Sequence, residues 1–314
     1  MQLLSIHGGR FMRSCDEGES WSDMWEHDAA ADCFHDEDSL YARPAFGNGI
    51  FVVPSGWGAP GAIYSSTDGA AWTRTSPIDV GGDETVDANS AGVFFDGERF
   101  GMLRDLRSSD GLAWTRETDL RPPNIGNVRR LEWSLEDELL VVLGNESEVF
   151  VSTDWGTTWS DPAPAAAACD AGQHRGDVAI AGGRIVIGHA LICTSEDAGA
   201  TWTTVTPHAN LEDLFATPTG FVAIHSDDTV SRSPDGLSWE VVGDLGVEPT
   251  AVAGTWAGEG DRLVAYAAFG ADQEAQLLRS EDGGATWTTA GVAPGTGCPR
   301  INLGTYRVPA QACE

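Results

Sequence analysis

The sequence contains no lysine, and its basic residues are few. All 18 of them are arginines, whereas aspartate and glutamate together number 48, so the formal net charge is −30. A surface this negative repels the phosphates of nucleic acids and of anionic lipid headgroups. We therefore expect no nucleic-acid partner and no membrane insertion, and we expect cations to be attracted.

Long apolar runs and helical patterns are missing too. No run of about 18 apolar residues predicts a membrane-spanning helix, and no amphipathic helix of useful length is visible. The chain begins with a strand-like segment, Met1–Ile6, and without a recognisable signal peptide. We interpret the sequence as a mature or trimmed form of an exported protein whose export signal is not present in this chain.

The six cysteines lack the closely spaced pairs that are typical of zinc ribbons. An even number of cysteines without such pairs favours three disulfides in an oxidising compartment, either extracellular or periplasmic. Buried free thiols in a cytosolic protein are the alternative.

One motif recurs seven times along the chain. It reads Ser-x-Asp, an optional residue, Gly, two residues and Trp, and we call each copy a Ser-Asp turn. The copies span 14–21, 66–72, 108–114, 152–159, 195–202, 233–239 and 280–287. Their tryptophans recur every 37 to 51 residues, and the interval from Trp287 through the C-terminus to Trp21 falls within the same range. Seven units therefore account for residues 1–314 as one domain.

Each residue type in the motif has a physical role in a hairpin. The aspartate side chain accepts hydrogen bonds from backbone N–H groups of its own turn. The glycine supplies the positive φ that the turn needs, and the tryptophan begins the next strand and packs on the hairpin. The motif therefore predicts a structural element rather than a catalytic one.

Apolar β-runs precede each motif. The fifth unit reads as strands over Asp177–Ala181, Arg184–His189 and Leu191–Thr194, followed by an outer strand from Trp202. Four short strands per unit predict an all-β fold, a seven-bladed β-propeller of four-stranded antiparallel blades. The first unit lacks an inner strand, so we expect Arg300–Pro309 to supply it and to close the ring by pairing with the N-terminal strands.

The seven motifs resemble the Asp-box (BNR) repeat superfamily over the whole chain. That superfamily includes sialidases, xyloglucanases, sortilin-type receptor domains, photosystem assembly factors and seven-bladed lectins. The resemblance implies the propeller fold, whereas function in such folds depends on the loops.

Sialidases are the enzymatic relatives with the sharpest motif. Their first substrate-binding arginine lies in a Phe/Tyr-Arg-Ile-Pro segment, which Tyr306-Arg307-Val308-Pro309 resembles, so Arg307 takes that position. Sialidases are six-bladed, however, and neither their Tyr–Glu pair nor their other two arginines have a recognisable counterpart here. Xyloglucanase-like enzymes place the active site between two propellers. A sialidase-like or other glycoside hydrolase is therefore the alternative function, and the sequence does not single out the two carboxylates it needs.

Blade topology places all seven histidines on one face, together with the links between blades. His7, His189 and His225 end second strands, and the others lie in links: His27, His35, His174 and His208. In the longest link, Ser22–Ala42, we predict a divalent cation site at His27, His35 and Asp36. Imidazole with carboxylate suits Zn²⁺ or Cu²⁺, and carboxylates alone suit Ca²⁺. A solvated polar loop is the alternative.

The same face carries arginines at the starts of inner strands. We predict that Arg43, Arg130, Arg175 and Arg300, with Arg307 and Trp25, bind a ligand at the mouth of the central channel. The alternative is that these arginines neutralise nearby carboxylates. The functional hypothesis is an exported, non-enzymatic binding or scaffold propeller whose ligand is a glycan, a partner protein or a cation.

Blade positions also predict the disulfides. Cys169 lies in a link and Cys193 on the third strand of the blade that follows, so we expect these two to pair. By analogy we expect Cys15–Cys298 in the closing blade, which leaves Cys33–Cys313. Other pairings, Cys298–Cys313 among them, remain open because six cysteines allow many combinations.

Overall fold

The described part of the computed structural model consists almost entirely of antiparallel β-sheets. It covers residues 2–7, 10–16, 20, 22–26, 44–55, 62–75, 78–81, 84–86, 92–103, 105–117, 120–126, 128–144, 148–163, 165, 169, 177–249, 251–256, 260–268, 275–293 and 301–306. Two compact units divide the chain: Met1–Leu120, Tyr266–Leu277 and Ala290–Glu314 form the first, and Arg121–Ala265 and Leu278–Thr289 form the second. Within these ranges, no helix has the length and apolar character needed to cross a membrane.

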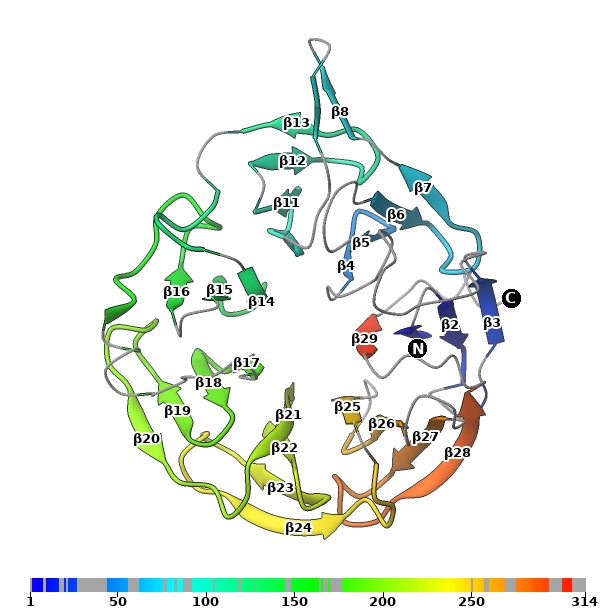
Figure 1. Cartoon of the computed structure of the whole chain (residues 1–314), viewed down its shortest axis with the longest axis vertical. Coiled ribbons are helices and arrows are strands. Elements are labelled where there is room, and N and C mark those ends of the chain that lie inside the picture. The colour runs from blue at the N-terminus through cyan, green and yellow to red at the C-terminus, as the bar shows by residue number, and fades with distance from the viewer. Residues whose placement is uncertain are drawn as a thin grey trace. The chain divides into compact units, whose positions relative to one another are not determined.

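The first unit contains three four-stranded sheets and a two-stranded hairpin among its described residues (Figure 1). The sheets, in strand order, are β29 (Ile301–Tyr306), β1 (Gln2–His7), β2 (Arg10–Ser14), β3 (Ser22–Glu26); then β4 (Ala45–Gly47), β5 (Ile50–Ser55), β6 (Ala62–Ser66), β7 (Thr73–Thr75); and β10 (Val93–Phe95), β11 (Phe100–Met102), β12 (Leu106–Ser108), β13 (Thr115–Arg116). The hairpin is β8 (Ile78–Gly81) and β9 (Glu84–Val86).

The second unit repeats the same plan. Its sheets are β14 (Val128–Ser134), β15 (Leu139–Gly144), β16 (Val149–Ser152); β17 (Asp177–Ala181), β18 (Arg184–Gly188), β19 (Ile192–Ser195), β20 (Thr203–Val205); and β21 (Leu211–Thr217), β22 (Gly220–His225), β23 (Thr229–Ser233), β24 (Glu240–Asp244). A further sheet contributes residues to both units and comprises β25 (Ala251–Trp256), β26 (Leu263–Ala268), β27 (Ala275–Ser280) and β28 (Thr288–Ala293). Within the second unit the first strands β14, β17, β21 and β25 are successive neighbours (Figure 1).

The C-terminal strand pairs with the N-terminal one, as the sequence predicts. Strand β29 runs antiparallel to β1, with Gln2 opposite Tyr306 and His7 opposite Ile301. The N-terminal strands therefore receive their first neighbour from the other end of the chain, and the sheet has the order β29-β1-β2-β3.

Two elements depart from the predicted plan of four strands per unit. The hairpin β8–β9 is an addition between β7 and β10. The sheet β14–β16 has three described strands, because pairing after Trp159 stops at Ser160, whose N–H donates to the Val151 carbonyl at 2.8 Å. Pro162 and Pro164 follow in the sequence, and proline has no N–H to donate to a sheet.

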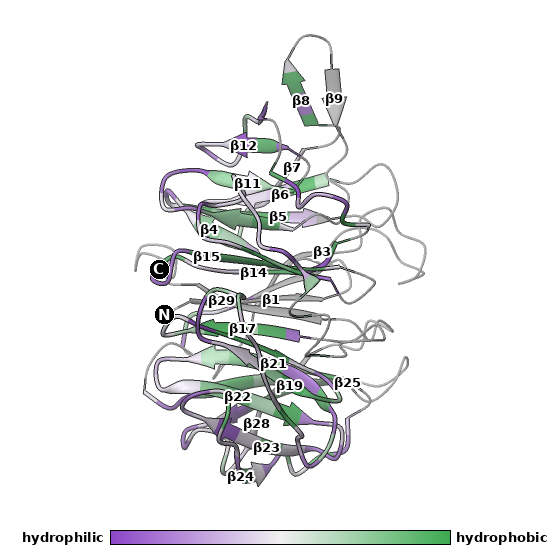
Figure 2. Ribbon diagram, turned by 90° about the vertical axis from the view of Figure 1, so that its left-hand side faces the viewer, coloured by the Kyte–Doolittle hydropathy of each residue, from purple (hydrophilic) through white to green (hydrophobic). Residues whose placement is uncertain are grey.

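The core lies between neighbouring sheets, and strand alternation divides it. In β17, Val178 and Ile180 face a cluster that includes Leu139 and Val141 of β15. The residue between them, Ala179, faces the opposite cluster, which includes Leu214 and Phe221. Successive side chains point to opposite faces of a strand, so a strand buried on both faces has a continuous apolar sequence. Figure 2 shows this as hydrophobic strands, such as β17 and β22, with hydrophilic turns.

The Ser-Asp turns have the geometry expected from their sequence. In the turn 233–239 the buried Ser233 hydroxyl donates to Asp235 and accepts from the Gly236 N–H at 2.7 Å. Asp235 Oδ1 accepts from the backbone N–H groups of Leu237 and Ser238 at 2.9 and 2.8 Å. The bond from the glycine N–H to the serine hydroxyl recurs in the other described turns that begin at Ser66, Ser108, Ser152, Ser195 and Ser280.

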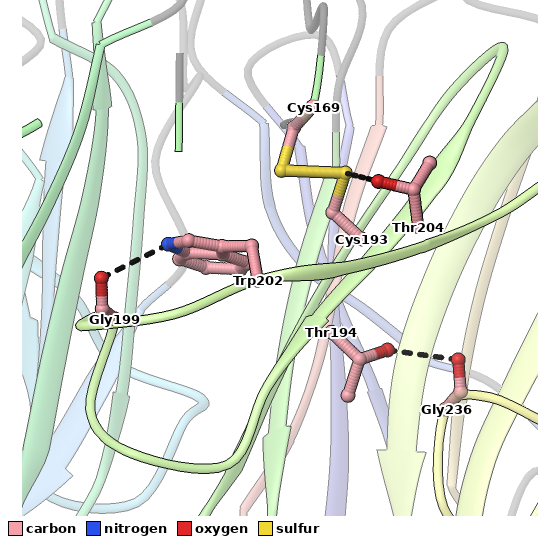
Figure 3. Close-up of a disulfide and its surroundings, with 7 residues drawn as sticks. All are labelled: Cys169, Cys193, Thr194, Gly199, Trp202, Thr204 and Gly236. Carbon is pink, nitrogen blue, oxygen red and sulfur yellow. Dashed lines mark hydrogen bonds between the residues drawn. A yellow bond between two sulfur atoms is a disulfide. The ribbon is translucent and has the colours of Figure 1, made fainter. Parts of the chain in front are cut away.

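The turn 233–239 also packs against the preceding sheet, which explains its glycine. Gly236 has a φ of 74°, and a Cβ there would lie 2.5 Å from Val186 Cγ2 of β18. The Thr194 hydroxyl of β19 donates to the Gly236 carbonyl at 2.8 Å, a contact visible in Figure 3. Both the left-handed conformation and the close approach require glycine. The turn therefore fastens one sheet to the next.

Candidate functional site

Buried carboxylates link the first strands of successive sheets in the second unit. Asp177, at the start of β17, is 3% exposed and receives both Nε and Nη2 of Arg130 from β14, at 2.7 and 2.6 Å. Its oxygens also accept the backbone N–H groups of Val178 at 2.9 Å and Leu214 at 3.4 Å. One carboxylate therefore ties β14, β17 and β21 together, and the guanidinium balances its buried charge.

A buried carboxylate also links the next two first strands, β21 and β25. Asp213 of β21 is buried and accepts the Gly254 N–H of β25 at 2.5 Å. A glycine is needed at position 254, because a Cβ there would lie 2.5 Å from the Phe215 ring. At Gly254 the backbone of β25 therefore lies close to β21, and the Asp213 carboxylate holds the two strands together.

Two histidines meet at the end of the sheet β21–β24. The rings of His208, in the link after β20, and His225, the last residue of β22, have centroids 4.2 Å apart. His225 is 1% exposed, and its Nδ1 lies 3.1 Å from the Ala209 carbonyl and its Nε2 2.6 Å from the Ser231 hydroxyl. His208 Nε2 lies 2.6 Å from the Thr229 hydroxyl.

The bonds of His225 fix the tautomer of its neutral ring. A carbonyl oxygen only accepts, so Nδ1 carries the proton and Nε2 accepts the Ser231 hydroxyl proton in the neutral ring. Burial lowers the pKa of His225 below its ordinary value of 6.5, and the neighbouring His208 lowers it further, whereas the Ala209 carbonyl and Asp227 act in the opposite direction. At neutral pH the ring is therefore uncharged.

Acidic side chains surround the same loop. Burial raises the pKa of Asp228, with further contributions from the negative charges of Glu248, Asp227, Asp244 and Glu212. Asp228 has a φ of 66°, and its backbone joins β22 to the β24 end through bonds from Asp228 N to His225 O and from Leu245 N to Asp228 O. Among the described residues, no group of three or more His, Cys, Asp or Glu side chains is arranged to hold a metal ion.

Most of the residues predicted to bind a ligand lie outside the described part of the chain. Arg130 is described, and its guanidinium is engaged by Asp177. Trp25 belongs to β3, whose backbone alone is described there. The remaining predicted residues fall outside the described ranges: Arg43, Arg175, Arg300, Arg307, His27, His35 and Asp36.

Cys169 and Cys193 form a disulfide, as the blade positions predict. Their Cα atoms are 5.7 Å apart, and the bridge fastens the incoming link to β19 (Figure 3). Cys15 is also disulfide-bonded. The three remaining cysteines, Cys33, Cys298 and Cys313, all lie outside the described residues. The pairings Cys15–Cys298 and Cys33–Cys313 therefore stay predictions.

The pairing of His208 with His225 is a feature that the motif analysis did not select. Both residues belong to the predicted histidine face, but the density of histidines and carboxylates in the sequence favours the link Ser22–Ala42. One signal was available: His225 ends the apolar segment Gly220–His225, which indicates a buried imidazole that needs partners on both nitrogens.

Comparison with known proteins supports the fold alone. No protein-family model matches the chain, and no curated protein matches it. Among solved structures, YCF48 bound to a D1 peptide has a TM-score of 0.56 at 17% identity, covering 81% of this chain and 82% of that one. A GH74 xyloglucanase from Xanthomonas campestris has a TM-score of 0.61 at 15% identity and covers 92% of this chain.

A chain of the nidogen/laminin complex is a third similar structure, with a TM-score of 0.53 at 10% identity and coverage of 96% and 95%. The chain spans about half of the xyloglucanase, 52% of its length. These matches place the chain in the β-propeller class.

Proposed function

We propose that residues 1–314 form one exported, seven-bladed propeller of the Asp-box superfamily that binds a partner polypeptide. Seven Ser-Asp turns at a regular interval and the pairing of β29 with β1 support a closed ring of seven blades. The disulfide Cys169–Cys193 supports an oxidising compartment, extracellular or periplasmic.

The binding face is the one that carries the histidines and the links between blades. Its proposed contacts are Arg43, Arg130, Arg175, Arg300, Arg307 and Trp25, and His27, His35 and Asp36 would add a divalent cation. A peptide-bound relative of the same fold, YCF48 with a D1 peptide, supports a polypeptide ligand over a glycan.

One observation carries the preference for binding over hydrolysis. The two buried carboxylates of the second unit's first strands, Asp177 and Asp213, are committed to strand-to-strand hydrogen bonds. Hydrolysis of a glycoside needs two carboxyl groups that are free to face a sugar and to exchange protons or attack it. Asp177 and Asp213 instead hold the scaffold, which favours recognition over hydrolysis at these first strands.

The test combines a selection with an activity assay. A random peptide library is selected on the folded chain, and the affinities of the enriched peptides are measured by calorimetry against the parent and against Arg130→Lys. This variant keeps the positive charge beside Asp177 and removes the planar guanidinium. We expect peptides with micromolar or tighter dissociation constants and at least about tenfold weaker binding to the variant.

The matched control is Arg184→Lys. Arg184 also pairs with a carboxylate, Glu196 at 2.8 Å, but it begins β18, whereas Asp177 lies opposite Gly188 at the other end of that strand. We expect this variant to bind like the parent. Turnover of sialosides or β-glucans by the parent, without any peptide binder, would replace the proposal with the glycoside hydrolase alternative.

A further inference from the structure

Several hydrogen bonds hold the link 206–210 and the first residue of β21, Leu211, against the strand ends of their neighbours, and the contact of His208 with the Thr229 hydroxyl at 2.6 Å is one of them. His225 Nδ1 donates to the Ala209 carbonyl at 3.1 Å, and the Ser226 N–H donates to the Asn210 carbonyl at 2.8 Å. The Leu211 N–H donates to the His189 carbonyl at 2.9 Å. Nδ1 of His225 donates to Ala209 whether or not the ring is charged, so the contact of this ring that depends on protonation is the one between Nε2 and the Ser231 hydroxyl.

The surroundings of His225 favour a neutral ring. Ser231 is 1% exposed, and its hydroxyl donates to Nε2 while the ring is neutral. A protonated ring would donate from both nitrogens, so the Ser231 hydroxyl would have to turn away and find another acceptor in a buried place. The charged ring would also lose its hydration, which is costly without a close counter-ion.

His208 makes protonation of the neutral His225 ring still less favourable. Its side chain is 39% exposed, and its Nε2 lies 3.6 Å from Asp227 Oδ2. Once charged, its ring is a positive group 4.2 Å from the centroid of the His225 ring.

The charged groups on the packed elements offer His225 little compensation. On β21, Asp213 is engaged by Gly254 N, and Glu212 is exposed. On β23, Arg232 pairs with Asp261. On β17, Asp177 pairs with Arg130. In the loop, Asp227 is the carboxylate that acts on His225, and it binds the Thr229 hydroxyl at 2.6 Å.

We propose that His225 and His208 form an acid-opened clasp, which holds the link 206–210 closed at neutral pH and releases it in mild acid. Opening detaches Ala209 and Asn210 from the end of β22 and exposes the His225 ring to water. The sheet itself stays intact, because its Ser-Asp turn lies at the other end of the strands.

The direction of the pH dependence follows from linkage. The released ring titrates near its ordinary value of 6.5, and the clasped ring has a lower pKa because of burial. The clasp therefore contributes its full stability above about pH 6.5 and loses it as the pH falls toward the lower value. In that interval each pH unit raises the open population by up to about tenfold.

Hydrogen exchange on the intact chain tests the clasp. The protection factors of the Leu211 and Ser226 amides are measured at pH 7.5 and 5.0, corrected for intrinsic exchange, with the Ile187 and Val222 amides of strands β18 and β22 as references. We expect the clasp amides to lose about tenfold or more of their protection at pH 5.0 and the reference amides to keep theirs. Equal protection of the clasp amides at both pH values would overturn the proposal.

Two variants separate the clasp from general acid sensitivity. His225→Asn keeps a donor for the Ala209 carbonyl and does not titrate, so its clasp amides should stay protected at pH 5.0. His208→Gln removes the charge that disfavours protonation of the closed His225 ring. The closed and open states then differ less in their affinity for the proton, so the clasp should open at a lower pH than in the parent. His189→Gln is the control and should leave the opening midpoint unchanged.

If His225→Asn does not fold, the His208→Gln midpoint decides the matter. An unchanged midpoint in that variant, or clasp amides of His225→Asn that open like those of the parent, would show that the pair is not the latch.

Discussion

The turns 195–202 and 233–239 occupy equivalent places in adjacent sheets but differ by one residue. Both share the serine-to-glycine bond and the bond from the tryptophan Nε1 to the glycine carbonyl, 3.0 Å in the first and 2.9 Å in the second. The longer turn places Ala198, with a φ of 53°, before its glycine. The shorter turn has no counterpart to Ala198.

The extra residue changes how the aspartate is used. In the shorter turn, Asp235 Oδ1 accepts two backbone N–H groups. In the longer turn, Asp197 Oδ1 accepts the Thr201 N–H at 2.8 Å, and Oδ2 accepts the Thr201 hydroxyl at 2.6 Å. The longer turn thus accepts a left-handed non-glycine residue and adds a side-chain bond. The comparison teaches that the serine and the glycine are the fixed parts of the turn, and that the rest adapts to its length.

The largest expected effect comes from the glycine. Gly236→Ala should lower the free energy of unfolding by about 3 kcal/mol, because it combines left-handed strain of about 1–2 kcal/mol with overpacking against Val186. Gly183→Ala is the matched control, since Gly183 has the same φ of 74° and nothing within 4 Å of the added Cβ. It should cost only the strain. Equal losses in urea unfolding would show that packing of the turn on β18 is unimportant.

The serine comes next, and here the two turns should behave alike. Ser195→Ala and Ser233→Ala each leave a buried glycine N–H without its acceptor, so each should cost about 2 kcal/mol. Ser238→Ala, at an exposed position, should change stability by less than about 0.5 kcal/mol. A loss in one turn that is more than twice the loss in the other would contradict the common role of the serine.

The third prediction concerns the longer turn alone. Ala198→Gly should raise the free energy of unfolding by about 0.5 kcal/mol, since glycine adopts positive φ without strain and this gain exceeds its extra backbone entropy. Ala200→Gly, outside the positive-φ set, should lower stability by about the same amount. Thermal and urea unfolding of both variants check the sign, and a destabilised Ala198→Gly would refute the interpretation of Ala198 as strained.

The smallest effect is expected for the threonine of the longer turn. The Thr201 hydroxyl is the main group that lowers the pKa of Asp197 below its ordinary value of 3.8, so Thr201→Val should raise that pKa. The bond's contribution to stability is present above pH 3.8 and is lost as the pH falls through the lower folded-state value. At neutral pH we expect a loss of roughly a few tenths of a kcal/mol, because both groups are exposed.

Carboxyl-carbon NMR titrations provide the measurement and the control together. Asp235 has its pKa lowered by the backbone N–H groups of Ser238 and Leu237, so it should titrate identically in Thr201→Val and in the parent. An unchanged Asp197 pKa in the variant would show that the hydroxyl bond does not distinguish the two turns.

The parts of the fold that the sequence predicts are local ones. The turn bonds join residues at most four positions apart, so the motif itself contains both donor and acceptor. The pairing of β29 with β1 was predictable because the first of the seven sequence repeats lacks an inner strand. The three-stranded sheet follows from Pro162 and Pro164, a signal that the expectation of four strands overlooked. The hairpin β8–β9 adds short strands, whose sequence pattern is weak.

The candidate site was harder to predict because it depends on contacts between segments. The link carrying His208 reaches the end of β22 only after the sheet has formed, so no spacing in the sequence reveals the ring contact. The Arg130–Asp177 pair joins two different sheets. Its sequence signal was the position of each residue near the start of a strand, which indicates a common face but not the partner.

The pairing of β29 with β1 has a consequence for how the chain folds during synthesis. Strand β1 leaves the ribosome well before β29, so β1 keeps an open edge until the residues of β29 have been synthesised. Contacts between residues so distant along the chain form slowly, because the ends must first meet. Strands β1 to β3 should therefore gain protection late and depend on a chaperone for longer than the sheets whose strands are all close in sequence.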